Sequence, residues 1–215
     1  IGHWDTSTVT VTHGMFEGNT SFNQDISSWN TAALVDSSYM FSGATAFNQN
    51  YTSSWNTAAV TNNSYMFTLP PPVTLHSNGV TIVASADAVV GQSYTLNGTS
   101  YLVVDNSTIA ANKTANIVTT RVTNMQSLFN GETTFNGDIS SWDTSAVTNM
   151  KMMFLQAREF NQDISAWDTS NNTNMDYMFS HAFKFNANIG SWDTSKGTIM
   201  RKVFERAYVF NQDIG

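Results

Sequence analysis

Cysteine is absent from this chain of 215 residues, which excludes disulfide bonds and metal sites built on thiolates. Charged residues are scarce, at 12% of the chain, and Asn, Ser and Thr provide polar groups in their place. This composition predicts an extracellular or cell-surface protein. The net charge of -7 and the lack of a basic stripe argue against nucleic-acid binding, which requires cations that neutralise phosphates.

Long apolar runs, targeting signals and catalytic motifs are missing too. No run is long enough to cross a bilayer, so we expect no membrane span. The chain starts at Ile1 with no signal peptide, which we interpret as a mature product or a slice of a longer chain. The four histidines lie far apart in sequence, without a nucleophile elbow, zincin helix or phosphate loop. We therefore expect a non-enzymatic protein with no catalytic residues.

The dominant feature that is present is an internal repeat of 25 or 26 residues, each copy beginning at a Trp. In most copies a Phe follows 12 residues later and a Phe-Asn pair six residues after that, as at Phe154 and Phe160. The consensus is W-[DN]-T-[SA]-x-V-T-N-M-x-x-M-F-x-x-A-x-x-F-N-Q-D-I-S-x.

Each repeat is predicted to contain a short helix and an extended leg. Met150, Met153, Phe154 and Ala157 follow the i, i+3, i+4, i+7 pattern of an amphipathic helix, after Thr and Asn residues that suit a helix N-terminus. The other half, "FNQDISAWDTS", is rich in turn formers and predicts a short strand or extended leg.

One repeat alone buries too little apolar surface to offset its conformational entropy. Its apolar side chains contribute on the order of 10 to 20 kcal/mol, against roughly 1.5 kcal/mol of ordering entropy for each residue. Stacked repeats would bury each other's side chains, so we expect an α/β fold, a leucine-rich-repeat-like solenoid of coils with one short extended leg and one short helix each. The residues expected in its core are Trp4, Trp29, Trp55, Trp142, Trp167, Trp192, Phe154, Phe160, Phe179 and Phe185.

The phrases "WDTSAVTNMKMMF", "AREFNQDIS" and "WNTAAVTNNSYMF" resemble the BspA-like leucine-rich-repeat surface proteins, a repeat family described in bacterial and Mycoplasma surface proteins. The resemblance implies a leucine-rich-repeat-like solenoid displayed outside the cell. It also implies a family with members that are sometimes called adhesins, and no known catalytic residues. Local departures, such as Ser37 in place of the first Met of the helix, predict bulges and not another fold.

The repeat is interrupted between Phe67 and Arg121. We expect a Pro-rich, polyproline-like connector, then strands in "GVTIVAS" and "SYTLNGTSYLVVD" with a hairpin turn at Asn97-Gly98, then a short helix in "NSTIAANKTANI". The predicted domains are a solenoid block at 1–67, a β-rich insert at 68–121 and a second solenoid block at 122–215. The insert is either a decorative loop or, as we favour, a cap or joint.

Two rows of aspartates recur in phase with the repeat, for example at Asp163 and at Asp168. They suggest either a row of calcium sites or turns in which each carboxylate accepts backbone N–H groups. The turn interpretation is favoured because Asn30, Asn56 and Asn188 occupy the same positions. We therefore expect no metal site and no cofactor, with calcium as the alternative.

N-glycosylation sequons predict candidate sites for covalent glycans. They lie at Asn19, Asn50, Asn62, Asn97, Asn106, Asn112 and Asn171. Chance produces a similar number in a chain rich in Asn, Ser and Thr, so position matters more than the count.

The ends of the chain lack visible polar caps. Ile1-Gly2 has the register of Ile214-Gly215, so either the sequence is a slice of a longer array or its ends stack head to tail with another copy. The leading hypothesis is an extracellular structural repeat protein that forms a surface or matrix fibre with itself as partner. The alternative is a cell-surface adhesin or recognition module for a host protein or glycan.

Overall fold

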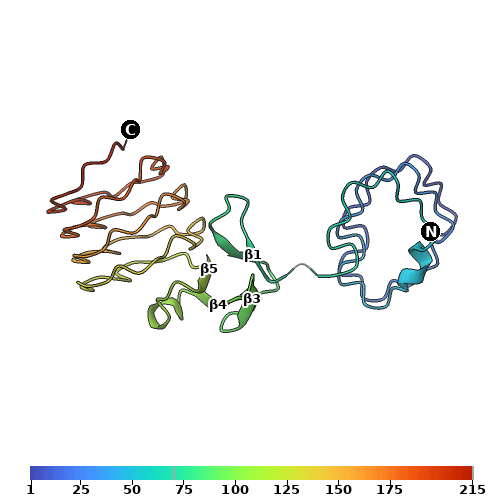
Figure 1. The fold of residues 1–215 in the computed structure, drawn as a ribbon, viewed down its shortest axis with the longest axis horizontal. Helices are drawn as coiled ribbons and strands as arrows, with labels where there is room; N and C mark the ends of the chain where they lie inside the picture. The colour runs from blue at the N-terminus through green and yellow to red at the C-terminus, as the bar shows by residue number, and fades with distance from the viewer. Residues whose placement is uncertain (70, 215) are drawn as a thin grey trace. The chain divides into compact units, whose positions relative to one another are not determined.

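The structure, a computed structural model, describes residues 1–69 and 71–214 and divides into two compact units, Ile1–Pro71 and Pro72–Gly215 (Figure 1). The insert expected at 68–121 therefore belongs, from Pro72 onward, to the second unit together with the later repeats. Pro70, in the predicted connector, and Gly215, in the predicted terminal register, lie outside the described residues.

The predicted α/β leucine-rich-repeat solenoid is wrong. No α-helix occurs in the described part of the chain, which has two short 3-10 segments, η1 (Gln49–Thr52) and η2 (Ile109–Ala111), and a few short strands. Outside the insert the repeats consist of turns, bends and irregular segments without a strand.

The segment expected to be helical, around Met150 to Ala157, is a series of tight turns. The Met153 amide donates to the Met150 carbonyl at 3.1 Å, whereas Met152 and Gln156 have φ of 56° and 62°. These left-handed residues stop an α-helix from propagating. Apolar side chains three and four residues apart still reach one side of the segment, which is why the pattern resembled a helix.

Consecutive repeats hydrogen-bond to each other in parallel, and we call each Trp-to-Trp segment a layer. Isolated parallel bridges link Val11, Asp36 and Asn62 in unit 1, and a second series in unit 2 runs from Asn124 to Ile199. The Met150 amide, for instance, donates to the Asn174 carbonyl at 2.9 Å. Alternate amides thus bond to a residue in the next layer and not within a helix.

Aromatic rings form rows that cross the layers and make the core. Phe154 stacks on Phe179 at 5.5 Å and on Phe160 at 4.0 Å. Eight of the ten predicted core residues are buried: Trp29, Trp55, Trp142, Trp167, Phe154, Phe160, Phe179 and Phe185. The other two are at or next to the outer layers: Trp192 is only partly buried, and Trp4 is 54% exposed, so its assignment to the core is wrong.

The insert forms two small sheets. Antiparallel β1 (Val73–Leu75) and β2 (Ile82–Ala84) make one; β3 (Ser93–Leu96), β4 (Thr99–Asp105) and β5 (Ile117–Arg121) make the other, with β4 and β5 parallel. The hairpin predicted at Asn97-Gly98 is confirmed, since Leu96 pairs with Thr99 and both turn residues have positive φ. Strand β1 was missed because its sequence follows three prolines.

The second sheet covers the first layer of the later repeats. Ile117 in β5 packs in the same core cluster as Met125 and Trp142. The Thr119 hydroxyl donates to the Asp143 carbonyl at 2.8 Å, as Thr144 does to Asp168 one layer later. The insert thus occupies the place of a preceding layer on this side of unit 2.

Candidate functional site: two open edges of the layers

A row of indole N–H groups links each Trp to the residues that lead into the preceding Trp. The Trp167 Nε1–H donates to the Ile139 carbonyl, just before Trp142, at 3.1 Å, and that of Trp192 donates to Ile164, just before Trp167, at the same distance. In unit 1, Trp29 donates to Ile1, just before Trp4. The row therefore ends wherever no preceding Trp segment is present.

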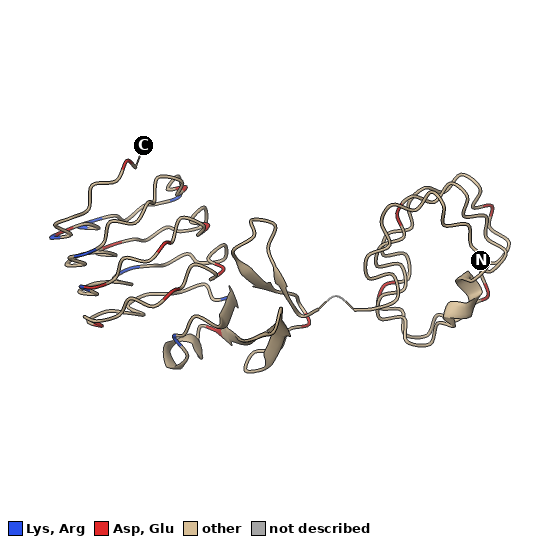
Figure 2. Cartoon of the chain, in the orientation of Figure 1, with Lys and Arg blue, Asp and Glu red and all other residues tan. Residues whose placement is uncertain are grey.

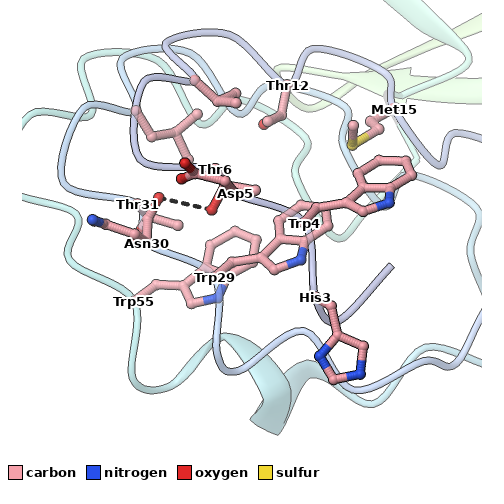
Figure 3. A pocket seen from close by; sticks show the side chains of 12 residues that line it. His3, Trp4, Asp5, Thr6, Thr12, Met15, Trp29, Asn30, Thr31 and Trp55 are labelled. Atoms are coloured by element: carbon pink, nitrogen blue, oxygen red, sulfur yellow. Dashed lines mark hydrogen bonds between the residues drawn. The ribbon is translucent and has the colours of Figure 1, made fainter.

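The first such end is the N-terminal edge, the outer side of residues 4–28 in unit 1. The indole of Trp4 stacks on Trp29 at 6.2 Å on one face, and its Nε1–H has no hydrogen-bond partner among the described residues. A hollow of about 400 Å³ opens here, lined by apolar side chains such as Trp29, Met15 and Leu34 (Figure 3). Val11, which is 59% exposed, lies on the same layer.

The second end is the C-terminal edge, the outer side of residues 192–214 in unit 2. A hollow of about 160 Å³ is lined by Phe179, Trp192, Met200 and Ile214, among others. Met200 and Ile214 are exposed, as are Ile199, Tyr208 and Val209 nearby. Part of this edge therefore consists of side chains whose equivalents are buried in the middle layers, as Met150 and Ile164 are for Met200 and Ile214.

The backbone groups left at the two edges are of opposite kind. At the C-terminal edge, the unpaired groups among the described residues include the amides of Met200, Lys202, Phe204 and Arg206. Their equivalents one layer earlier, such as Met175 and Tyr177, donate to the next layer. At the N-terminal edge, the carbonyls that no described residue bonds to include those of Val11, His13, Met15 and Glu17. In this series of turns the C-terminal edge presents a row of donors and the N-terminal edge a row of acceptors, although a separate bond from the Thr148 amide to the Thr123 carbonyl runs in the opposite direction.

Charge also differs between the edges (Figure 2). Unit 1 has no Lys or Arg in its sequence, and its first layer contains Asp5, Glu17 and Asp25. The last layer of unit 2 contains four cations: Lys196, Arg201, Lys202 and Arg206. Arg201 binds the buried carboxylate of Asp176 at 2.8 Å, which raises the pKa of Arg201.

The in-phase aspartates act in turns. Asp163 Oδ1 accepts from the Ser165 amide at 2.9 Å, and the same contact recurs from Ser27 to Asp25. Hydrogen bonds from the side chain and amide of Ser165 lower the pKa of Asp163. Asn30 accepts from Ala32 in the same way, as the sequence predicted. In the described residues, no group of three or more His, Cys, Asp or Glu side chains is placed to hold a metal ion.

The Asn residues of the Phe-Asn pairs form a ladder of hydrogen bonds from layer to layer. Asn161 Oδ1 accepts from the Asn186 amide at 2.7 Å, and Asn186 Oδ1 accepts from the Asn211 amide at 2.9 Å. Asn161 and Asn211 are exposed, so the ladder runs along the surface.

The candidate glycosylation sites fall into two groups. The side-chain amide nitrogens of Asn106, Asn112 and Asn171 donate to Thr123, Thr108 and Ser145 respectively. These bonds would have to break before a glycan joined that nitrogen. The Asn62 side chain hydrogen-bonds to the Asp36 carboxylate. The amide nitrogens of Asn19, Asn50 and Asn97 have no partner among the described residues, and these three residues are exposed.

His13 and His181 have serine partners that the sequence did not reveal. His13 Nδ1 lies 2.8 Å from Ser38 Oγ, which donates to Asp36 at 2.6 Å. The serine is the middle member, whereas a catalytic triad places the histidine between the serine and the carboxylate. His181 Nδ1 lies 2.9 Å from Ser180 Oγ, and Ser180 is fully buried. Neither arrangement presents an activated nucleophile to solvent.

The family model described as "Mycoplasma protein of unknown function, DUF285" matches residues 1–73 and 99–215. The chain belongs to this family. The match omits residues 74–98, which include strands β2 and β3 of the insert. No curated protein and no solved structure matches the chain significantly. No helix in the described part of this DUF285 protein is long and apolar enough to cross a membrane.

Proposed function

We propose that this DUF285 protein is a non-enzymatic structural protein at the cell surface or in an extracellular matrix, related to the BspA-like surface repeat proteins. Its copies associate head to tail into a fibre, and the glycans it carries are attached at exposed sequons such as Asn97. The observation that supports this proposal is the pair of open edges: the C-terminal edge has unpaired amides and the N-terminal edge has unpaired carbonyls among the described residues.

Opposite rows of donors and acceptors support a head-to-tail contact. Two N-terminal edges would place carbonyl against carbonyl, whereas an N-terminal edge on a C-terminal edge pairs donors with acceptors. A heterologous contact of this kind propagates into a filament unless it closes into a ring. The exposed apolar side chains of both edges would leave water on association.

Electron microscopy of the purified full chain over a range of concentrations tests this function. The expected result is filaments that lengthen as concentration rises. Met200→Asp places a carboxylate on the C-terminal edge, at a position where the equivalent Met150 and Met175 are buried, and should abolish them. Val89→Asp is the matched control, because Val89 is 56% exposed and lies in the insert. Monodisperse particles of the wild-type chain at high concentration would contradict the proposal.

A recognition role is the second candidate, and the observation favouring it is the indole of Trp4. Half-exposed aromatic faces stack on sugar rings and on apolar ligands. Binding of the chain to a glycan array, lost in Trp4→Ala and retained in Met200→Asp, would support recognition over assembly.

A further inference from the structure

We propose that a second copy of this chain docks in a single register, with its first layer continuing the layers of unit 2 as if it were the next repeat. Trp142, Trp167 and Trp192 are 25 residues apart, and Trp4 of the second copy takes the position 25 residues beyond Trp192. The inference rests on the proposed head-to-tail assembly and specifies which residues meet.

Backbone pairing follows from the order of the layers. Met175 donates to Ile199 and Tyr177 donates to Arg201 within unit 2. Extending this series by one layer brings the amides of Met200, Lys202, Phe204 and Arg206 onto the carbonyls of Val11, His13, Met15 and Glu17 of the second copy. The series of backbone bridges from Asn174 to Ile199 then continues to Val11 of the second copy. Within that copy Val11 already bridges to Asp36.

Side-chain bonds extend in the same register. The Ile189 carbonyl accepts from the Trp192 amide, and one layer earlier Ile164 accepts both the Trp167 amide and the Trp192 indole. Ile189 thus has room for the indole N–H of Trp4 of the second copy. Thr169 Oγ1 donates to Asp193, so Thr194 Oγ1 would donate to the Asp5 carbonyl.

Charge favours this partner and aids its approach. The first layer carries three carboxylates and no Lys or Arg, whereas the last layer has four cations against Asp193, Glu205 and Asp213. Oppositely charged surfaces accelerate association, and salt screens the effect. We therefore expect association to slow as ionic strength rises.

The last layer of unit 1, residues 55–67, is the competing surface. Its amides at Asn63, Tyr65 and Phe67 have no partner among the described residues. Asn62 is the last residue in the series of backbone bridges of unit 1, as Ile199 is in unit 2. Its repeat breaks off after Phe67, before a Phe-Asn pair, so Phe22 and Asn23 of a docked layer would gain no partners. The complete layer at 192–214 offers Phe210 to stack on Phe22 and Asn211 to bond with Asn23. Within unit 2, Phe185 and Asn186 make these same two contacts with Phe210 and Asn211.

Disulfide trapping between two singly substituted full-length chains tests the register, because the native chain has no cysteine. Val11→Cys is mixed with Ile199→Cys, and in parallel with Asn62→Cys. The expected result is a cross-linked heterodimer that forms several-fold faster with Ile199→Cys. The double variant Val11→Cys, Asp36→Cys calibrates the geometry, since these residues already bridge within one chain.

Equal rates with both partners, or faster trapping with Asn62→Cys, would overturn the register. If filaments form but the Ile199→Cys cross-link does not, the head-to-tail assembly stands and this register is rejected. If neither filaments nor the cross-link form, both the assembly and the register are rejected. Trp4→Phe gives a second measurement that needs no cysteine. It keeps a ring but removes the indole donor, and should weaken association about five- to tenfold; no change would exclude the bond to Ile189.

Discussion

The two units of this DUF285 protein contain the same repeat but bury it to different extents. Trp142, in unit 2, is fully buried between the insert and the following layer, whereas Trp4, which begins the same phrase in unit 1, is 54% exposed. Phe154 and Phe179 are likewise fully buried in the middle of unit 2. The comparison teaches that a neighbouring layer, and not the repeat's own sequence, decides whether its aromatic residues form a core.

The largest expected effect is on the middle layers of unit 2. Phe154→Ala removes a fully buried ring that stacks on four others, and should lower the free energy of unfolding by about 3–5 kcal/mol. Trp4→Ala should cost less than about 1 kcal/mol in the monomer, since water already reaches the ring. Urea unfolding measured at low protein concentration compares the two, and equal losses would contradict the role assigned to neighbouring layers.

The capping role of the insert gives the next largest effect. Ile117→Ala in β5 should cost about 2–4 kcal/mol, because Ile117 is 1% exposed against the first layer of the later repeats. Hydrogen exchange should then speed up in unit 2 around Met125 and stay unchanged in unit 1. Thr95→Ala, on an exposed position of β3, is the control within the insert. A uniform rise in the exchange rate over both units would contradict the assignment of the insert as a cap on unit 2.

Acid should weaken both units through the aspartate turns. Hydrogen bonds from the Ser residues two positions later lower the pKa of Asp25 in unit 1 and of Asp163 in unit 2. The folded form therefore binds a proton less readily than the unfolded form, so the stabilisation is complete above the ordinary carboxyl pKa of about 4. It is lost as pH falls through the lowered values.

Thermal melts monitored by circular dichroism between pH 6 and pH 2 check the sign. We expect a melting temperature that decreases steadily below about pH 4. Asp163→Asn keeps an acceptor without the charge, so its melting temperature should fall less over this range. A melting temperature that rises on acidification would contradict the turn assignment.

The smallest effect is expected at the hairpin of the insert. Gly98 has φ of 83°, and a Cβ there meets no atom within 4 Å, so Gly98→Ala costs only backbone strain of about 1 kcal/mol. Gly137→Ala is a contrasting case, because its Cβ would lie 3.1 Å from the Phe135 ring. Chemical denaturation measures both, and a gain in stability for Gly98→Ala would contradict the turn geometry.

The sequence predicted features that depend on neighbours in the chain. The length of the repeat, the rows of aromatic residues, the Asn97-Gly98 turn and the aspartate turns all follow from local sequence patterns. The helix prediction failed because Met152 and Gln156 are left-handed without being Gly, the residue that usually signals this conformation. The signal lies in other copies of the repeat, where Gly14 is equivalent to Met152 and Gly131 to Gln156, both with positive φ. The bond that replaces the helical one comes from a residue one repeat away.

The open edges were only partly predictable. The repeat phrase in the first and last layers was visible in the sequence, but the exposure of Trp4 and the polarity of the two backbone rows depend on how the layers bond. The direction of those bonds, with amides of one layer donating to the next, is a property of the turn series. No residue type in the repeat encodes it on its own.

Sedimentation velocity of the wild-type chain, Met200→Asp and Val89→Asp over a wide concentration range tests the central claim most directly, namely that an open edge is completed by another copy. We predict that wild type and Val89→Asp sediment faster as concentration increases, while Met200→Asp remains a monomer. A wild-type chain that stays monomeric at every concentration, or a Met200→Asp variant that assembles equally well, would contradict the claim.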